Sequence, residues 1–138
     1  MKIDCIRKGL ESYGEDAALV ALKSYEAQVK KRIHNMGMDQ TGKQIGNYKS
    51  RSWIKKRQEA GRQVGYIDLE MTGELRKGLT TGQIRGGAAL GFSSDAAKEK
   101  QGWQTDRYGD LWRPTVLEQR NIQERFWNYM KRKMKSCK

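Results

Sequence analysis

The sequence predicts an α+β domain in which two long helices pack on a small antiparallel sheet and a long basic loop joins them. Apolar residues recur at three- and four-residue steps over about 15–36 and 115–135, as on one face of a helix. Between these stretches, two strand-like runs flank Arg85-Gly86-Gly87, which suits a tight turn. With no linker-like or repeated segment, residues 1–138 are predicted to form a single domain.

The first long helix is predicted over residues 15–36. Acidic residues open this stretch and basic residues close it, which suits the helix dipole. A short amphipathic helix is predicted before it, at 3–13, with Gly14 as the break and Gly37 as the final stop. His34, in the basic last turn, is expected to be a surface cap. The apolar stripe consists of Leu19, Leu22, Tyr25, Val29, Ile33 and Met36.

A basic loop is predicted over about residues 39–65. The cations interleave with Tyr48 and Trp53, and such a mixture can bind phosphates and stack on bases. The alternative, which we favour for the rings, is that Tyr48 and Trp53 anchor the loop to the core while the cations stay solvated. The basic residues are Lys43, Lys49, Arg51, Lys55, Lys56, Arg57 and Arg62.

The segment 64–71 alternates apolar and polar residues. It fits either a short extended strand or a loop that docks the same side chains against the core. Thr72 is a suitable N-cap, so a helical turn or two is expected over residues 74–79. The apolar side chains to be buried are Ile67, Leu69 and Met71.

Residues 79–84 and 88–92 are predicted to be the strands of the sheet. Their side chains are small, so we expect the long helices to pack closely against this hairpin. A short helix is then predicted to begin at Ser93 or Ser94 and to end at Gly102. An aromatic connection follows, with a third strand expected at 111–113.

The second long helix is predicted over about 115–135, directly after Pro114. Thr115 and Glu118 have the spacing of a capping box. Its last turns are basic, and residues 131–138 form a basic tail that is a second candidate contact for an anion. The cations of this tail are Lys131, Arg132, Lys133, Lys135 and Lys138.

The charge of the chain points to an anionic partner. Lys and Arg number 28 against 16 Asp and Glu, which gives a net charge of +12. Ribosomal, DNA-binding and viral structural proteins all fit such a charge, and so does a basic surface that is merely solvated.

No motif indicates catalysis. His34 is the only histidine, and Asp106 and Asp110 are better explained as turn residues. Cys5 and Cys137 lack the spacing of a zinc site, and free thiols are favoured over a disulfide between the ends of the chain. We therefore expect no enzymatic activity, no cofactor and no metal site.

The N-terminus lacks the apolar core of a signal peptide, and no apolar run approaches the roughly 20 residues needed to span a membrane. A soluble protein, made in a cytoplasm and without a membrane partner, is expected.

Short phrases in a fixed order carry a family resemblance. The first group is Gly42-Lys43-x-Ile45-Gly46-x-Tyr48, Gly61-Arg62-Gln63, Ile67-Asp68-Leu69 and Thr72-Gly73-x-Leu75. The second is Ala96-Ala97, Gln101-Gly102 and Arg113-Pro114-Thr115, before the closing helix. Over about residues 15–135, the chain resembles the head–tail joining proteins of tailed bacteriophages, the small neck or tail-completion proteins.

The resemblance implies a structural virion protein with an α+β fold. Its subunits would form a homo-oligomeric ring, often of six or twelve copies, in the neck between the capsid portal or an adaptor ring and the tail proteins. The ring would surround the DNA exit channel, where the loop and tail cations could contact phosphates of packaged DNA without reading sequence, or an acidic neighbouring ring. The alternative is a sequence-nonspecific nucleic-acid-binding protein.

Overall fold

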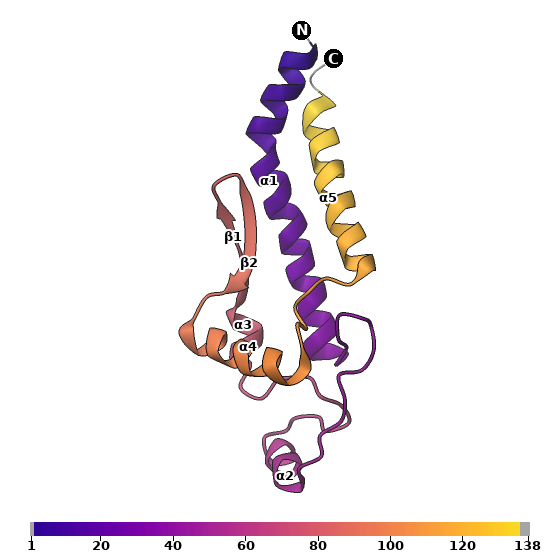
Figure 1. The fold of residues 1–138 in the computed structure, drawn as a ribbon, viewed down its shortest axis with the longest axis vertical. Helices are drawn as coiled ribbons and strands as arrows, with labels where there is room; N and C mark the ends of the chain where they lie inside the picture. Colours follow the sequence, from indigo (N-terminus) through magenta and orange to yellow (C-terminus); the bar gives the residue numbers. More distant parts are fainter. Residues whose placement is uncertain (1, 136–138) are drawn as a thin grey trace. The chain divides into compact units, whose positions relative to one another are not determined.

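The computed structural model describes residues 2–135 and has an α+β fold (Figure 1). Two long helices and a two-stranded antiparallel sheet are present, so the predicted fold class is confirmed. The elements run in the order α1 (Lys2–Lys30), η1, a π-helical turn (Lys31–Asn35), α2 (Arg51–Glu59), α3 (Glu74–Gly78), β1 (Leu79–Ile84), β2 (Gly87–Phe92), α4 (Asp95–Tyr108) and α5 (Val116–Met134).

The chain divides into two compact units. Unit 1 comprises Met1–Gln28, Thr80–Gly91 and Val116–Lys138, and unit 2 comprises Val29–Leu79 and Phe92–Thr115. The single domain over residues 1–138 stays a prediction.

The first helix runs without interruption through Gly14, so the predicted break there is wrong. A glycine inside a helix costs only about 1 kcal/mol relative to alanine, which a long helix can absorb. The predicted stop at Gly37 is confirmed, because this glycine has a φ of 63° and its amide bonds to the Ile33 carbonyl. The buried row repeats every four residues and differs in part from the predicted stripe: Ala17, Ala21, Tyr25, Val29 and Ile33.

In unit 1, carboxylates of α1 hold the hairpin. The Thr81 amide donates to Glu26 at 2.9 Å, and the Gly86 amide in the turn donates to Glu15 at 2.7 Å. These acceptors satisfy donors that an edge strand would otherwise leave open. The Thr81 hydroxyl also donates to the Leu22 carbonyl at 3.3 Å, so a long helix lies against the hairpin as predicted, although the Cβ positions of the hairpin glycines have no tertiary contact within 4 Å.

The last helix, α5, lies beside α1 within unit 1 (Figure 1). Met130 is fully buried, and the Met134 side chain lies 3.1 Å from where a Cβ on Gly9 would be. The bounds of α5 confirm the prediction of a helix over about 115–135.

Cys5 is disulfide-bonded, so the expectation of a free thiol there is wrong, and Cys137 lies outside the described residues.

Within residues 2–135, no helix has the length and apolar character needed to cross a membrane.

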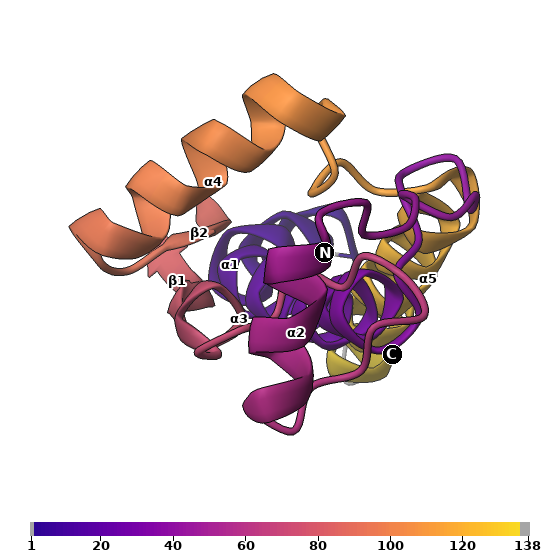
Figure 2. The ribbon, with the colours of Figure 1, turned by 90° about the horizontal axis from the view of Figure 1, so that it is seen from below.

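Unit 2 contains α2, α3 and α4, which Figure 2 shows from below. The predicted basic loop is interrupted by α2, which Ser50 caps by accepting from the Trp53 amide at 3.3 Å. Residues 64–71 dock as a loop, the second of the two predicted alternatives. The short helix predicted after Thr72 is confirmed as α3.

The helix α4 begins after Ser94, as predicted, but continues through Gly102 to Tyr108. Its predicted end at Gly102 is therefore wrong, and Gly109, with a φ of 81°, follows its last residue. The third strand predicted at 111–113 is also wrong. Leu111 and Trp112 are buried in a turn, with Trp112 edge-on to Phe92 at 5.4 Å.

Gly37 is expected to tolerate no side chain. A Cβ there would lie 2.4 Å from Cδ2 of Tyr66 and 2.7 Å from the Ile67 carbonyl oxygen, in addition to the left-handed φ. Gly37→Ala should lower the free energy of unfolding by well over the roughly 1–2 kcal/mol that the left-handed backbone alone costs. Urea denaturation of the full chain, followed by circular dichroism, measures the loss.

Gly42→Ala is the matched control. Gly42 has a φ of 80° but no described neighbour within 4 Å of its Cβ position, so only the backbone cost applies. If Gly37→Ala and Gly42→Ala lowered the free energy of unfolding equally, the close contact with Tyr66 would add nothing to the backbone cost.

Candidate functional site

The residue at the centre of the site is Arg57, on α2 in unit 2. Its side chain is 1% exposed and donates to the Gln63 carbonyl at 3.0 Å and the Glu70 carbonyl at 2.9 Å. Its Nη2 lies 2.9 and 3.1 Å from the two carboxylate oxygens of Asp68. The guanidinium lies over the Tyr48 ring, 4.4 Å from the ring centroid. We call Arg57, Asp68, Tyr48 and Gln63 the hub.

Asp68 collects further donors in the hub. Its Oδ1 accepts from the Tyr48 hydroxyl and from the Glu70 amide, both at 3.0 Å. Its Oδ2 accepts from the Gln63 side-chain amide at 2.6 Å. Burial, together with the negative charge of Asp68, raises the pKa of Tyr48 to about 12, so this hydroxyl remains a donor at neutral pH.

Arg57 is therefore not a surface cation. Its prediction as a contact for DNA or a partner is wrong, whereas the same prediction for Lys55 and Lys56 stays a prediction. Consecutive residues of a helix point about 100° apart, so the three side chains face different directions. Arg57 faces Asp68, while Lys55 and Lys56 are exposed.

His34 lies against the hub and is 4% exposed, so its prediction as a surface cap is wrong. Its Nδ1 is 2.9 Å from the Asp68 carbonyl oxygen, which only accepts, so Nδ1 carries the proton. Nε2 then has a lone pair, is buried and has no partner among the described residues. Burial lowers the pKa of His34, against the opposing hydrogen bond to Asp68.

Leu69 is the one non-glycine residue within 2–135 that has a positive φ, 54°. This backbone costs about 1–2 kcal/mol and persists only where the surroundings fix it. Arg57 fixes both neighbours, since it binds the Asp68 carboxylate and the Glu70 carbonyl. Leu69 contributes to the lining of a groove.

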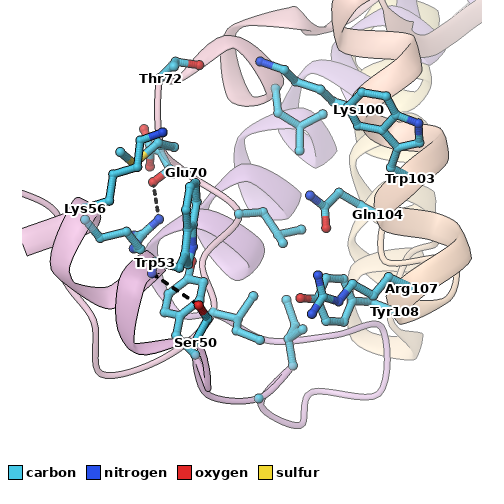
Figure 3. Close-up of a pocket in the computed structure, with 18 of the residues that line it drawn as sticks. Ser50, Trp53, Lys56, Glu70, Thr72, Lys100, Trp103, Gln104, Arg107 and Tyr108 are labelled. Carbon is cyan, nitrogen blue, oxygen red and sulfur yellow. Dashed lines mark hydrogen bonds between the residues drawn. The ribbon is translucent and has the colours of Figure 1, made fainter. Parts of the chain in front are cut away.

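The groove has a volume of about 1020 Å³ and lies in unit 2, between the α2 region and α4. Figure 3 shows Trp53 and Lys56 on one side and Trp103, Gln104 and Tyr108 on the other. Trp103 is 60% exposed. The apolar part of the lining, which we call the floor, consists of Ile45, Ile67, Leu69, Met71 and Leu75.

Three cations of the groove lining have no acidic partner among the described residues: Lys49, Lys56 and Arg107. Two of them lie over aromatic rings. Lys56 is 5.6 Å from the centroid of Trp53, and Arg107 is 5.5 Å from that of Tyr108. We call these three residues the free cations of the groove.

The two acids of the lining are already engaged. Glu70 lies 3.3 Å from Arg76 and 3.9 Å from Arg62. Glu74 pairs with Lys100, which holds the pKa of this carboxyl below its usual range. The groove therefore presents positive charge around an apolar floor.

The other predicted cations lie outside this groove or have a partner. In unit 2, Lys43, Arg51 and Lys55 are exposed, and Arg62 is half-buried beside Glu70. The tail cations belong to unit 1, so the two predicted sets are in different units. Residues 136–138 of the tail lie outside the described part of the chain. The described tail cations, all exposed, are Lys131, Arg132, Lys133 and Lys135.

The contribution of α4 to the groove was missed, because this helix was expected to end at Gly102. Its groove residues follow helical spacing, and that spacing was the available signal. They are Lys100, Trp103, Gln104, Arg107 and Tyr108.

Within residues 2–135, no group of three or more His, Cys, Asp or Glu side chains is placed to hold a metal ion. The groove offers apolar surface and positive charge, which suit binding. Comparison with family models, curated proteins and solved structures finds no match for this chain.

Loss of the Arg57 side chain is expected to unfold unit 2 readily. Arg57→Ala leaves the Asp68 carboxylate buried without its counter-charge, which costs about 3–5 kcal/mol of unfolding free energy. Lys55→Ala, on the same helix, removes an exposed ion pair with Glu59 at 4.0 Å and should change stability by less than about 1 kcal/mol. Chemical denaturation of both variants is the measurement, and similar losses would contradict a central role for Arg57.

Stability is expected to fall as the pH drops below about 6.5, the ordinary histidine pKa. The pKa of His34 is lower in the folded state, so the unfolded chain binds the proton first. The stability that neutral, buried His34 contributes is intact above about pH 6.5. It decreases as the pH falls from there to the pKa of His34 in the folded state, and below that pKa it does not change further. Besides burial, the charges of Asp68, Glu70 and Arg76 act on this imidazole.

The measurement is the unfolding free energy between about pH 8 and pH 5, where the slope cannot exceed about 1.4 kcal/mol per pH unit for one proton. His34 is the only histidine of the chain, so His34→Gln should remove this slope. If the slope remained in His34→Gln, other titratable groups would be the cause of the pH dependence.

Proposed function

We propose that this chain is a structural virion protein, a subunit of a ring in the neck of a tailed bacteriophage. The ring joins the capsid portal to the tail around the DNA exit channel, and the protein works by assembly and catalyses nothing. It is made in the host cytoplasm and ends in the virion.

The observation that carries the proposal is the set of large apolar side chains exposed on unit 1. Only 36% of the chain is hydrophobic, yet many of these residues remain in solvent. An apolar helix face that the described chain leaves uncovered suits a protein–protein contact. On α1, Ile3 is 80%, Ile6 41% and Leu10 44% exposed. On α5, the exposed apolar residues are Val116, Leu117 and Trp127.

The phrases that resemble neck proteins support the same proposal from unit 2. Tyr48, Gln63 and Asp68 each belong to a different phrase, and all three meet at Arg57. The resemblance therefore rests on residues that hold the fold together, as expected for a shared scaffold without a shared reaction.

The alternative is a sequence-nonspecific nucleic-acid-binding protein. It is favoured by the net charge of +12 and by the exposed cations of the α2 region, Lys49, Arg51, Lys55 and Lys56. Such a protein needs no ring and would bind through phosphates, with an affinity that falls steeply as salt rises.

The oligomeric state distinguishes the ring subunit from the nucleic-acid-binding protein. The purified protein is expected to form a closed oligomer of six or twelve copies in native mass spectrometry. The double variant Ile6→Lys with Leu10→Lys should shift it toward monomer, because two charges would enter an apolar contact. Ser12→Lys with Gln119→Lys adds the same charge at exposed polar positions of unit 1 and should leave the oligomer intact.

A wild-type protein that stays monomeric, alone and with portal and tail proteins, would overturn the ring. Tight, salt-sensitive binding of such a monomer to duplex DNA would establish the alternative.

A further inference from the structure

We infer that the groove of unit 2 binds an acidic segment of a partner protein that carries an aromatic or aliphatic anchor residue. The inference rests on the groove alone and holds whether or not the chain belongs to a phage neck.

The size and the apolar floor of the groove indicate that something fills it. A volume of about 1020 Å³ is at the upper end of the range for ligand pockets and can take several side chains. Ile45, Leu69 and Met71 of the floor remain half-exposed, and Trp103 is 60% exposed beside them. Tryptophan is enriched among residues that dominate binding energy, and an anchor side chain would cover it and the floor together.

The charges of the groove select an acidic ligand. Lys49, Lys56 and Arg107 are the free cations, whereas the acids of the lining are occupied by Arg76, Arg62 and Lys100. An acidic segment would supply the counter-charges that the described chain does not provide. Electrostatic complementarity of this kind speeds association and selects partners.

The backbone of the groove is preorganised. Leu69 is held in a left-handed conformation by the bonds that Arg57 makes to its two neighbours. Strained residues of this kind cluster at sites where a ligand binds. A floor that is fixed before binding does not lose conformational freedom when the ligand arrives.

A peptide fits the groove better than a nucleic-acid strand. One face of Tyr48 is covered by Arg57 and one face of Trp53 by Lys56, which reduces the surface free for stacking bases. A nucleic-acid strand would also bring a phosphate at every nucleotide past Glu70 and Glu74. A peptide can place its acids at the free cations and neutral residues beside these glutamates.

The test is a selection from a random peptide library displayed on yeast, with the full chain as bait. Enriched peptides are expected to combine Asp or Glu with Phe, Trp or Leu. A synthetic, fluorescein-labelled copy should lose about tenfold or more in affinity with Trp103→Ala and with Arg107→Glu, as read by fluorescence anisotropy. Its binding to the wild type should weaken as salt rises.

Each variant has a matched control. Met36→Ala removes another large exposed apolar side chain of unit 2, and Lys98→Glu reverses an exposed charge on α4; both residues lie outside the groove lining. Both should bind the peptide as the wild type does. Circular dichroism verifies that all four variants are folded.

Three results would overturn the inference. The first is a failed peptide prediction: the selection enriches no peptide or only basic or uncharged ones, or the enriched peptide binds Trp103→Ala as tightly as the wild type. The second is a labelled oligo-dT that binds the wild type and is lost in both groove variants, which would make the groove a nucleic-acid site. The third is an oligomer that dissociates in both groove variants, which would make the occupant a second copy of this chain. None of these outcomes depends on the apolar face of unit 1, which the assembly experiment tests separately.

Discussion

The buried ion pair between Arg57 and Asp68 is the constraint on which unit 2 depends. Removing two charges from water costs several kcal/mol for each ion, and the attraction between them offsets this only when their other hydrogen-bonding groups are also satisfied. Here Gln63, Tyr48 and Glu70 supply those partners. The pair therefore holds α2 and the loop from Gln63 to Glu70 in fixed positions against each other, although neither belongs to a long helix or to the sheet.

The groove is a consequence of this arrangement. The segment after the ion pair is bound at Asp68 and at Glu70, so Leu69 between them takes a conformation that an isolated peptide would avoid. Tyr48 and Arg57 also belong to the groove lining. The binding surface and the stability of unit 2 thus rest on the same residues.

The sequence predicted what depends on local pattern and missed what depends on distant partners. The hairpin and α5 follow from periodicity and turn chemistry within a few residues. The breaks expected at Gly14 and Gly102 failed because a single glycine costs less than a long helix gains from packing. Arg57 looked like its neighbours Lys55 and Lys56, since nothing local marks the one cation that meets a buried acid. His34 was predicted at the surface for the same reason. The α4 residues that line the groove were not predicted, because that helix was expected to end at Gly102.

The ion pair also has an evolutionary consequence. Neither Arg57 nor Asp68 can change first without leaving a buried charge alone, so a path that replaces both must cross a poorly stable intermediate. The two positions are coupled by epistasis and should change together or not at all. An arginine followed eleven residues later by an aspartate, with tyrosine and glutamine at the other hub positions, is thus a pattern for recognising remote relatives. It would persist in lineages whose surface charges have diverged.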